Sequence, residues 1–257
     1  MGWGSNTRNA TKDFSAATAA GETSGSSFIH KFGHTHAVGT SNEDIWLTGG
    51  SYNWLTSSAG IRVKAGGNAA DAAGGAGAKT VTIVGLNQLW GEAEETVTLS
   101  GTAASPSTTG SFVRVFRAYV STVGAYGATN VGNVVLETTS SITIASIDAG
   151  QGQSQVGLYT VPTGKTAYLN YVELSVDSSK RADIVLTSRK DADITTGGNM
   201  ASWRIKAQWD GMKNSSQTSY PYPMKFSEKT DITFNAKVDS GTAAVSVHFG
   251  LNLLTNT

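Results

Sequence analysis

The stretch AAVSVHFGLNLL, residues 243–254, decides the fold class because its side chains alternate between apolar and polar. The apolar residues share one face: Ala243, Val245, Val247, Phe249, Leu251 and Leu253. The small or polar residues share the other: Ala244, Ser246, His248, Gly250 and Asn252. A period of two over this length predicts a half-buried antiparallel strand.

Other stretches of the chain repeat this signal. DITFNAKV (231–238), WRIKAQW (203–209) and YLNYVELSV (168–176) also alternate. SFVRVFRAYV (111–120) is apolar on both faces, which predicts a central strand covered on both sides. Turn-like breaks separate these stretches, with no helical pattern between them. The pattern predicts an all-β fold, an antiparallel and jelly-roll-like β-sandwich with two packed sheet regions.

The stretch IDAGQGQSQ, residues 147–155, is the predicted seam between two parts of the chain. It separates an N-terminal β region, residues 45–150, from a C-terminal jelly-roll-like β-sandwich, residues 151–257. The seam is rich in glycine and polar residues, which are typical of connections between folded units.

Residues 1–44 are expected to form an extended N-terminal arm outside the core. They are rich in Gly, Ser, Thr, Ala and Asn, and the Ala-rich stretch 11–20 offers at most a short helix. Fully burying a large apolar side chain is worth ~1.5–3 kcal/mol, whereas ordering each residue costs ~1–2 kcal/mol of backbone entropy. Six large apolar residues stand against that cost: Trp3, Phe14, Phe28, Ile29, Phe32 and Val38. The arm is therefore predicted to become ordered only against a partner.

The charge balance bears on the classes of partner. The chain has 257 residues, with 19 Lys plus Arg and 19 Asp plus Glu, so its formal net charge is zero. Nucleic-acid binders normally carry a basic surplus, so no nucleic-acid partner is expected. The sequence has no cysteine, no Sec-type signal at its start and no apolar run near the ~20 residues of a membrane span. No membrane partner is expected.

The stretches that resemble ligand-binding or catalytic motifs do not match the patterns that those motifs require. AADAAGGAGAKTVTIVGL (69–86) ends its loop in Lys79–Thr80, but Ala73 and Ala78 occupy the glycine positions that a phosphate loop requires. DADITTGGNMAS (191–202) lacks the glycine and the glutamate of a calcium-binding EF-hand loop. The adjacent carboxylates of EAEE (92–95) are interpreted as a charged hairpin tip. No enzyme activity, cofactor or catalytic residue is predicted.

Histidines and tryptophans form the remaining candidate sites. His30, His34 and His36 are the only histidine cluster, but no carboxylate or thiolate nearby in sequence completes a metal site, so no metal ligands are predicted. Four aromatic residues near the front of the folded part are candidates for an interface or for glycan contact: Trp46, Tyr52, Trp54 and Trp90. Packing in a core or an interface is the commoner role of such residues.

Several stretches together resemble a group of structural proteins in marine tailed bacteriophages. They include EDIWLTGGSYNWLTSS (43–58), AKTVTIVGLNQLWGEAEETVTLSGT (78–102), YTVPTGKTAYL (159–169) and the C-terminal strands, and the similarity extends from about Phe28 to the C-terminus. None of these motifs is catalytic. The resemblance implies a virion location and self-association, commonly as a trimer, together with other virion proteins as partners.

Three functions follow as hypotheses. The first is a structural subunit on the capsid exterior, such as a decoration, cement or fibre protein. The second is a tail component, at the tail tip or associated with an adaptor. The third is a carbohydrate-binding adhesin module that would use the tryptophans to contact a host surface glycan.

Overall fold

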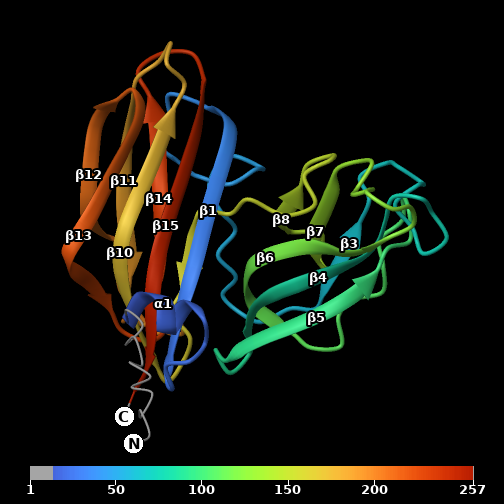
Figure 1. Cartoon of the computed structure of the whole chain (residues 1–257), viewed down its shortest axis with the longest axis horizontal. Coiled ribbons are helices and arrows are strands. Elements are labelled where there is room, and N and C mark those ends of the chain that lie inside the picture. The colour runs from blue at the N-terminus through green and yellow to red at the C-terminus, as the bar shows by residue number, and fades with distance from the viewer. Residues whose placement is uncertain (1–13, 257) are drawn as a thin grey trace, which may run out of the picture.

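The computed structural model describes residues 14–256 and consists almost entirely of antiparallel β-structure. Figure 1 shows a tall β-sandwich with a smaller β domain beside it. The one helix in the described residues is α1 (Phe14–Ala19), near the foot of the sandwich. No helix among residues 14–256 is long and apolar enough to cross a membrane. The predicted all-β, antiparallel sandwich is confirmed.

Two antiparallel sheets form the sandwich. The first has the order β1-β15-β10-β13, with bounds Ser26–Val38, Ala243–Thr255, Lys165–Val176 and Asn214–Phe226. The second has the order β12-β11-β14-β2, with bounds Arg204–Met212, Ala182–Arg189, Asp231–Val238 and Glu43–Asp44. The short β9 (Leu158–Thr160) also pairs with β14, next to β2 in register. If β2 and β9 are counted as one interrupted strand, these orders are those of a jelly roll.

The sandwich core follows the alternation read from the sequence. In β15 the predicted inner residues Val245, Val247, Phe249 and Leu251 are buried, while Ser246 and His248 face outward and are half-buried. Strand β10, the neighbour of β15 in the same sheet, adds Leu169 and Leu174 to this core, and β14 of the opposite sheet supplies Phe234. Phe234 lies across from Phe249, with ring centroids 5.1 Å apart.

The smaller domain is inserted between β2 and β9. It contains two three-stranded sheets, β3-β7-β8 and β5-β4-β6. Their bounds are Ile61–Lys64, Val134–Thr138, Thr143–Ile147, Glu92–Thr98, Ala78–Asn87 and Phe112–Val123. Its own apolar core includes Ile83, Phe112 and Leu136. The insertion leaves the sandwich after β2 and returns to it just before β9, so the domain is tethered at both ends.

The loop that resembles a phosphate loop serves as an entry to β4. The buried carboxylate of Asp71 accepts backbone N–H hydrogen bonds from Ala78, Val131 and Gly132, which ties this loop to the one before β7. Its negative charge and its strand context both oppose phosphate binding at this position.

Strand β6 corrects one detail of the sequence interpretation. It is covered on both faces as predicted, but it ends its sheet, and β4 is the central strand. The covering on the second face comes from the sandwich. Phe112 and Val115 join the core of the inserted domain, whereas Val113 and Phe116 join the sandwich core. A strand shared between two cores therefore has the apolar pattern of a central strand.

The boundary of the predicted arm also needs correction. Residues 26–38 form β1, which pairs with β15 from Ser26–Leu254 to Val38–Ala243 and belongs to the sandwich. The inward-facing residues of β1 include Lys31, Gly33 and Thr35, so an inventory of large apolar residues underestimates its burial. Residues 1–13 of the predicted arm lie outside the described residues.

The domain boundaries shift for the same reason. The sandwich takes β1 and β2 from the N-terminal side of the chain, so it is not confined to residues 151–257. The predicted seam at Ile147–Gln155 begins at the last residue of β8 and runs toward β9, where the chain returns from the inserted domain. The EAEE stretch forms part of β5 and is not a hairpin tip.

The close approach of β1 to the start and end of the insertion gives a first testable prediction. A Cβ at Gly33 would overlap the backbone of Gly157 and lie 2.6 Å from the Ile45 carbonyl oxygen. We expect Gly33→Ala to cost ~1–3 kcal/mol of unfolding free energy, because backbone must move. The melting temperature should fall by roughly 2–4 °C per kcal/mol.

Gly39→Ala is the matched control. Gly39 follows β1 directly, and its added Cβ would meet only a Glu43 carboxylate oxygen, at 3.8 Å. Thermal unfolding followed by circular dichroism measures both variants. Equal melting temperatures would show that β1 does not pack as described.

Candidate functional site: the interface between the two domains

A buried ion pair joins the inserted domain to the sandwich. Arg114 on β6 is 1% exposed and Asp231 at the start of β14 is 0% exposed. Arg114 Nε and Nη2 donate to the two carboxylate oxygens of Asp231, each over 2.9 Å. This bidentate arrangement gives the strongest hydrogen-bonded ion pair that a guanidinium and a carboxylate form. It fixes the orientation of β6 against β14.

Other side chains complete the environment of Asp231. Arg189 Nη2 on β11 donates to it over 2.6 Å, and the Thr160 hydroxyl on β9 donates over 2.6 Å. The remaining nitrogen of Arg114, Nη1, donates to the carbonyl oxygens of Leu55 and Val113. These donors hold the carboxylate of Asp231 in a fixed position at the interface between the two domains.

Two of the four candidate aromatics enclose Arg114. Its guanidinium lies 5.0 Å from the ring centroid of Trp54 and 4.9 Å from that of Trp90. Arg189 lies over Trp54 and over Trp203, a tryptophan that the sequence interpretation did not single out. Cation–π contacts of this kind gain strength when the cation is withdrawn from water. The tryptophans therefore pack around the joint between the domains.

The other two candidates lie in the core of the inserted domain. Trp46 is 2% exposed and Tyr52 is 5% exposed, and their ring centroids are 5.0 Å apart. Trp90 is 8% exposed. These three rings cannot offer an open face to a sugar, whereas Trp54 is half-buried beside Trp203. The structure thus brings the four aromatics together mainly as packing residues.

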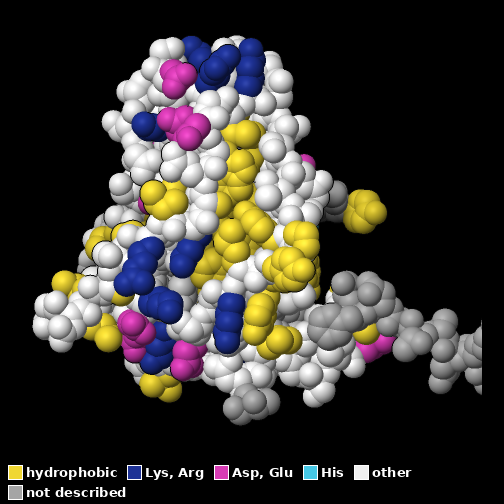
Figure 2. Space-filling view, turned by 90° about the vertical axis from the view of Figure 1, so that its left-hand side faces the viewer, with side chains coloured by type: hydrophobic (Ala, Val, Ile, Leu, Met, Phe, Trp, Pro, Cys, Tyr) yellow, Lys and Arg dark blue, Asp and Glu magenta, His cyan; other side chains and the backbone are white. Residues whose placement is uncertain are grey.

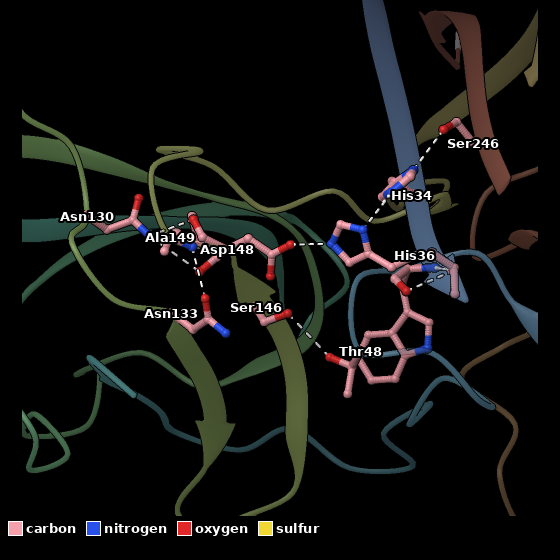
Figure 3. A network of polar contacts seen from close by, with 12 residues as sticks. His34, His36, Thr48, Asn130, Asn133, Ser146, Asp148, Ala149 and Ser246 are labelled. Carbon is pink, nitrogen blue, oxygen red and sulfur yellow. Dashed lines mark hydrogen bonds and ion pairs between the residues drawn. The ribbon is translucent and has the colours of Figure 1, made fainter. Parts of the chain in front are cut away.

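A chain of polar contacts crosses the interface at the surface (Figure 3). Ser246 lies 2.8 Å from His34 Nδ1, His34 Nε2 lies 3.1 Å from His36 Nδ1, and His36 Nε2 lies 2.6 Å from Asp148. Asp148 directly follows β8, so this chain links the sandwich to the end of the insertion. Partial burial, followed by the neighbouring His36, lowers the pKa of His34.

The histidines do not gather as a single cluster. His30 packs instead against His248, with ring centroids 4.1 Å apart. Among residues 14–256, no group of three His, Cys, Asp or Glu side chains is placed to hold a metal ion. His34 and His36, two residues apart on β1, lie on the same face of the strand.

Lys31 is the most unusual ionisable group of the interface. It points inward from β1, is buried, and donates from Nζ to the Phe116 carbonyl oxygen on β6. Burial, and secondarily the positive charge of Arg117, lowers the pKa of Lys31 to about 7. Sequence reasoning missed Lys31, Arg114 and Asp231. The available signal was a charged residue within or directly beside a run of apolar strand residues.

No family model matches the sequence, and no curated protein matches it. Solved structures of infectious bursal disease virus, strains Gt and Gx, align over 90% of this chain and 73% and 71% of theirs. They share 10% sequence identity with it, with TM-scores of 0.26 and 0.27. Scores at this level do not establish a shared fold, so the jelly-roll assignment rests on the strand order.

The ion pair gives the second prediction. We expect Asp231→Asn to lower the unfolding free energy by ~3–5 kcal/mol, because the new amide would leave the buried Arg114 without its counter-charge. Asp193→Asn is the control, since its pair with Lys229 is only about two-thirds buried and such pairs are worth ~0–1 kcal/mol. Urea denaturation measures both. Similar losses in the two variants would contradict the role assigned to Asp231.

Lys31 gives the third prediction, on pH. The pKa of Lys31 falls from 10.5 to about 7 on folding. Between these values the unfolded chain binds a proton that the folded chain lacks, so this residue makes stability rise with pH, by at most ~1.4 kcal/mol per pH unit. Below pH 7 the cost of burying the charge is fully present. Lys31→Met removes this contribution.

The expected result is a difference that depends on pH. The unfolding free energy of the wild type minus that of Lys31→Met should increase from pH 7 to pH 10, as measured by denaturant titration at each pH. Lys213→Met, at an exposed position, controls for the loss of a lysine. A difference that stays constant across this range would refute the prediction.

Proposed function

We propose that this chain is a structural subunit of a tailed-bacteriophage virion, located on the capsid exterior as a decoration, cement or fibre protein. One observation carries the proposal: a jelly-roll sandwich with a complete second β domain inserted beside β14. Jelly rolls build viral capsid domains and also lectin domains, so this support is an analogy at the level of the fold. The sequence resemblance to phage structural proteins points the same way.

The joint between the domains fits such a role. A particle subunit needs a fixed shape, and the insertion is tethered at both ends and held by the buried Arg114–Asp231 pair. Interfaces between domains otherwise permit relative motion unless they are large and apolar. In this role the chain needs no catalytic turnover, cofactor or metal, and its zero net charge lets neutral surfaces tile without repulsion.

The free edge of the sandwich supports self-association. Strands β12 and β13 each end their sheet, and Figure 2 shows an apolar stripe on this side with Lys and Arg side chains along its borders. Ile205 and Tyr222 are exposed here, and Trp209, Met212 and Tyr220 are partly buried. An apolar centre with a charged rim is typical of protein–protein interfaces. The proposed partners are further copies of the chain, assembled as a trimer, and other virion proteins.

The fourth prediction concerns copy number. Quantitative mass spectrometry of purified virions, with isotope-labelled peptides of this chain and of the major capsid protein, counts the copies per particle. We expect on the order of hundreds, because an exterior subunit repeats with capsid symmetry. A handful of copies would instead assign the chain to the tail. Absence from purified virions would reject both locations.

A further inference from the structure

A cleft of about 440 Å³ opens between the two domains, where β1 meets strands β4, β5 and β6. It lies on the opposite side of β6 from the core of the inserted domain. Its lining includes aromatic, basic and acidic side chains from both domains. A volume of this order suits a small ring-shaped molecule. Neither the packing of the ion pair nor the proposed assembly role uses this cleft.

The inner wall of the cleft is buried and carries polar groups that can form further hydrogen bonds. Tyr159 is buried, and its hydroxyl has no hydrogen-bond partner among the described residues. Burial, aided by the nearby Glu92 carboxylate, raises the pKa of Tyr159, so this hydroxyl remains protonated and able to donate. Lys31 Nζ donates to one protein acceptor, the Phe116 carbonyl oxygen, and in either protonation state it carries at least one further N–H group. Both groups lie on the cleft wall.

The outer part of the cleft presents carboxylates. Glu92 and Glu94 are exposed on β5 and line the opening. Glu92 pairs with Lys165 over 2.6 Å, and Glu94 accepts from the Tyr119 hydroxyl over 3.3 Å. A carboxylate offers about four lone-pair positions, so each retains acceptors for further donors. Arg117 also lines the cleft and donates to the His30 carbonyl oxygen.

Aromatic rings complete the surface. Phe116 and Tyr159 pack together with ring centroids 4.5 Å apart, and Phe28 and Tyr119 line the same cleft. Apolar ring faces of this kind accommodate the C–H face of a flat, polar molecule while their neighbours hydrogen-bond its edge.

This combination selects a ligand class. The carboxylates of Glu92 and Glu94 disfavour an anionic ligand, and the guanidinium of Arg117 disfavours a cationic one. A ligand with a net charge of either sign is therefore repelled by one of these groups. A ring with several hydroxyls matches all of these groups, because each hydroxyl both donates and accepts. We propose that the interdomain cleft binds one neutral saccharide unit, either a free sugar or the terminal residue of a surface glycan.

The proposed saccharide site differs from the glycan contact considered for the tryptophans. It stands independently of the virion role, since it is tested on the isolated full-length protein. A second hollow, lined by Trp54 and Trp203, offers the alternative location for an aromatic sugar platform. The variants below separate the two.

The fifth prediction is tested by saturation-transfer NMR and titration with glucose, galactose, mannose and N-acetylglucosamine. We expect at least one of them to bind with a millimolar Kd. Tyr159→Phe should weaken that binding about five- to tenfold, which corresponds to the loss of one hydrogen bond. The same variant should melt no lower than the wild type, because it removes an unpartnered buried hydroxyl. Glu94→Gln, at an exposed position, should weaken binding without affecting the core.

Matched controls locate the site. Tyr126→Phe removes a hydroxyl from a fully exposed tyrosine, and Trp203→Ala removes the platform of the second hollow; both should leave affinity unchanged. Loss of binding in Trp203→Ala with retention in Tyr159→Phe would overturn the proposal. The proposal would also be overturned if none of the four sugars binds at concentrations up to roughly 10 mM, about ten times a Kd of 1 mM. Tighter binding of glucuronate or glucosamine than of the neutral sugars would overturn the ligand class.

A glycan array separates the two sources of the saccharide. Binding to immobilised glycans that end in the preferred sugar supports a surface glycan as the ligand. Binding of the free sugar alone, with no array signal, supports a free sugar in the same cleft.

Discussion

The arrangement of the two domains depends on one buried carboxylate, that of Asp231. Withdrawing this charge from water costs several kcal/mol, and the cost is offset only because Arg114, Arg189 and Thr160 all donate to it. These donors come from the inserted domain, from the neighbouring strand β11 and from the end of the insertion at β9. The folded position of β6 therefore determines whether β14 can bury its first residue. The folding of the sandwich and the placement of the inserted domain therefore depend on the same buried ion pair.

The parts of the fold that could be predicted from sequence are those where one face is apolar throughout. Strands β10, β14 and β15 have this pattern and lie where the alternation places them. Strand β1 does not, because its inner face carries Lys31, Gly33 and Thr35, which are buried for reasons of hydrogen bonding and close backbone approach. For Ile205 the prediction is wrong in the opposite sense. The alternation in β12 predicts a buried side chain, but Ile205 is exposed, since β12 has no neighbouring strand on its outer side.

The aromatic residues show a second limit of sequence reasoning. Trp46, Tyr52, Trp54 and Trp90 were recognisable as a group, but their position depends on residues far along the chain. Trp90 and Trp54 reach the same guanidinium only because β6 carries Arg114 between them. The aromatic lining of the interdomain cleft, by contrast, comes from three different strands of two domains and includes Phe28, Phe116, Tyr119 and Tyr159. No spacing within one segment could reveal that juxtaposition.

The free edge of the sandwich constrains how copies of the chain can meet. An open edge strand is a template for pairing with another strand, and β13 counters this with Pro221 and Pro223, which lack the N–H that a ladder requires. Its register against β10 also jumps between Ser219 and Met224, so the strand is bulged there. Extension of the sheet from one copy to the next is thereby blocked along this stretch. In the proposed self-association, contacts along this stretch of β13 would therefore be made by side chains, such as those of the apolar stripe (Figure 2).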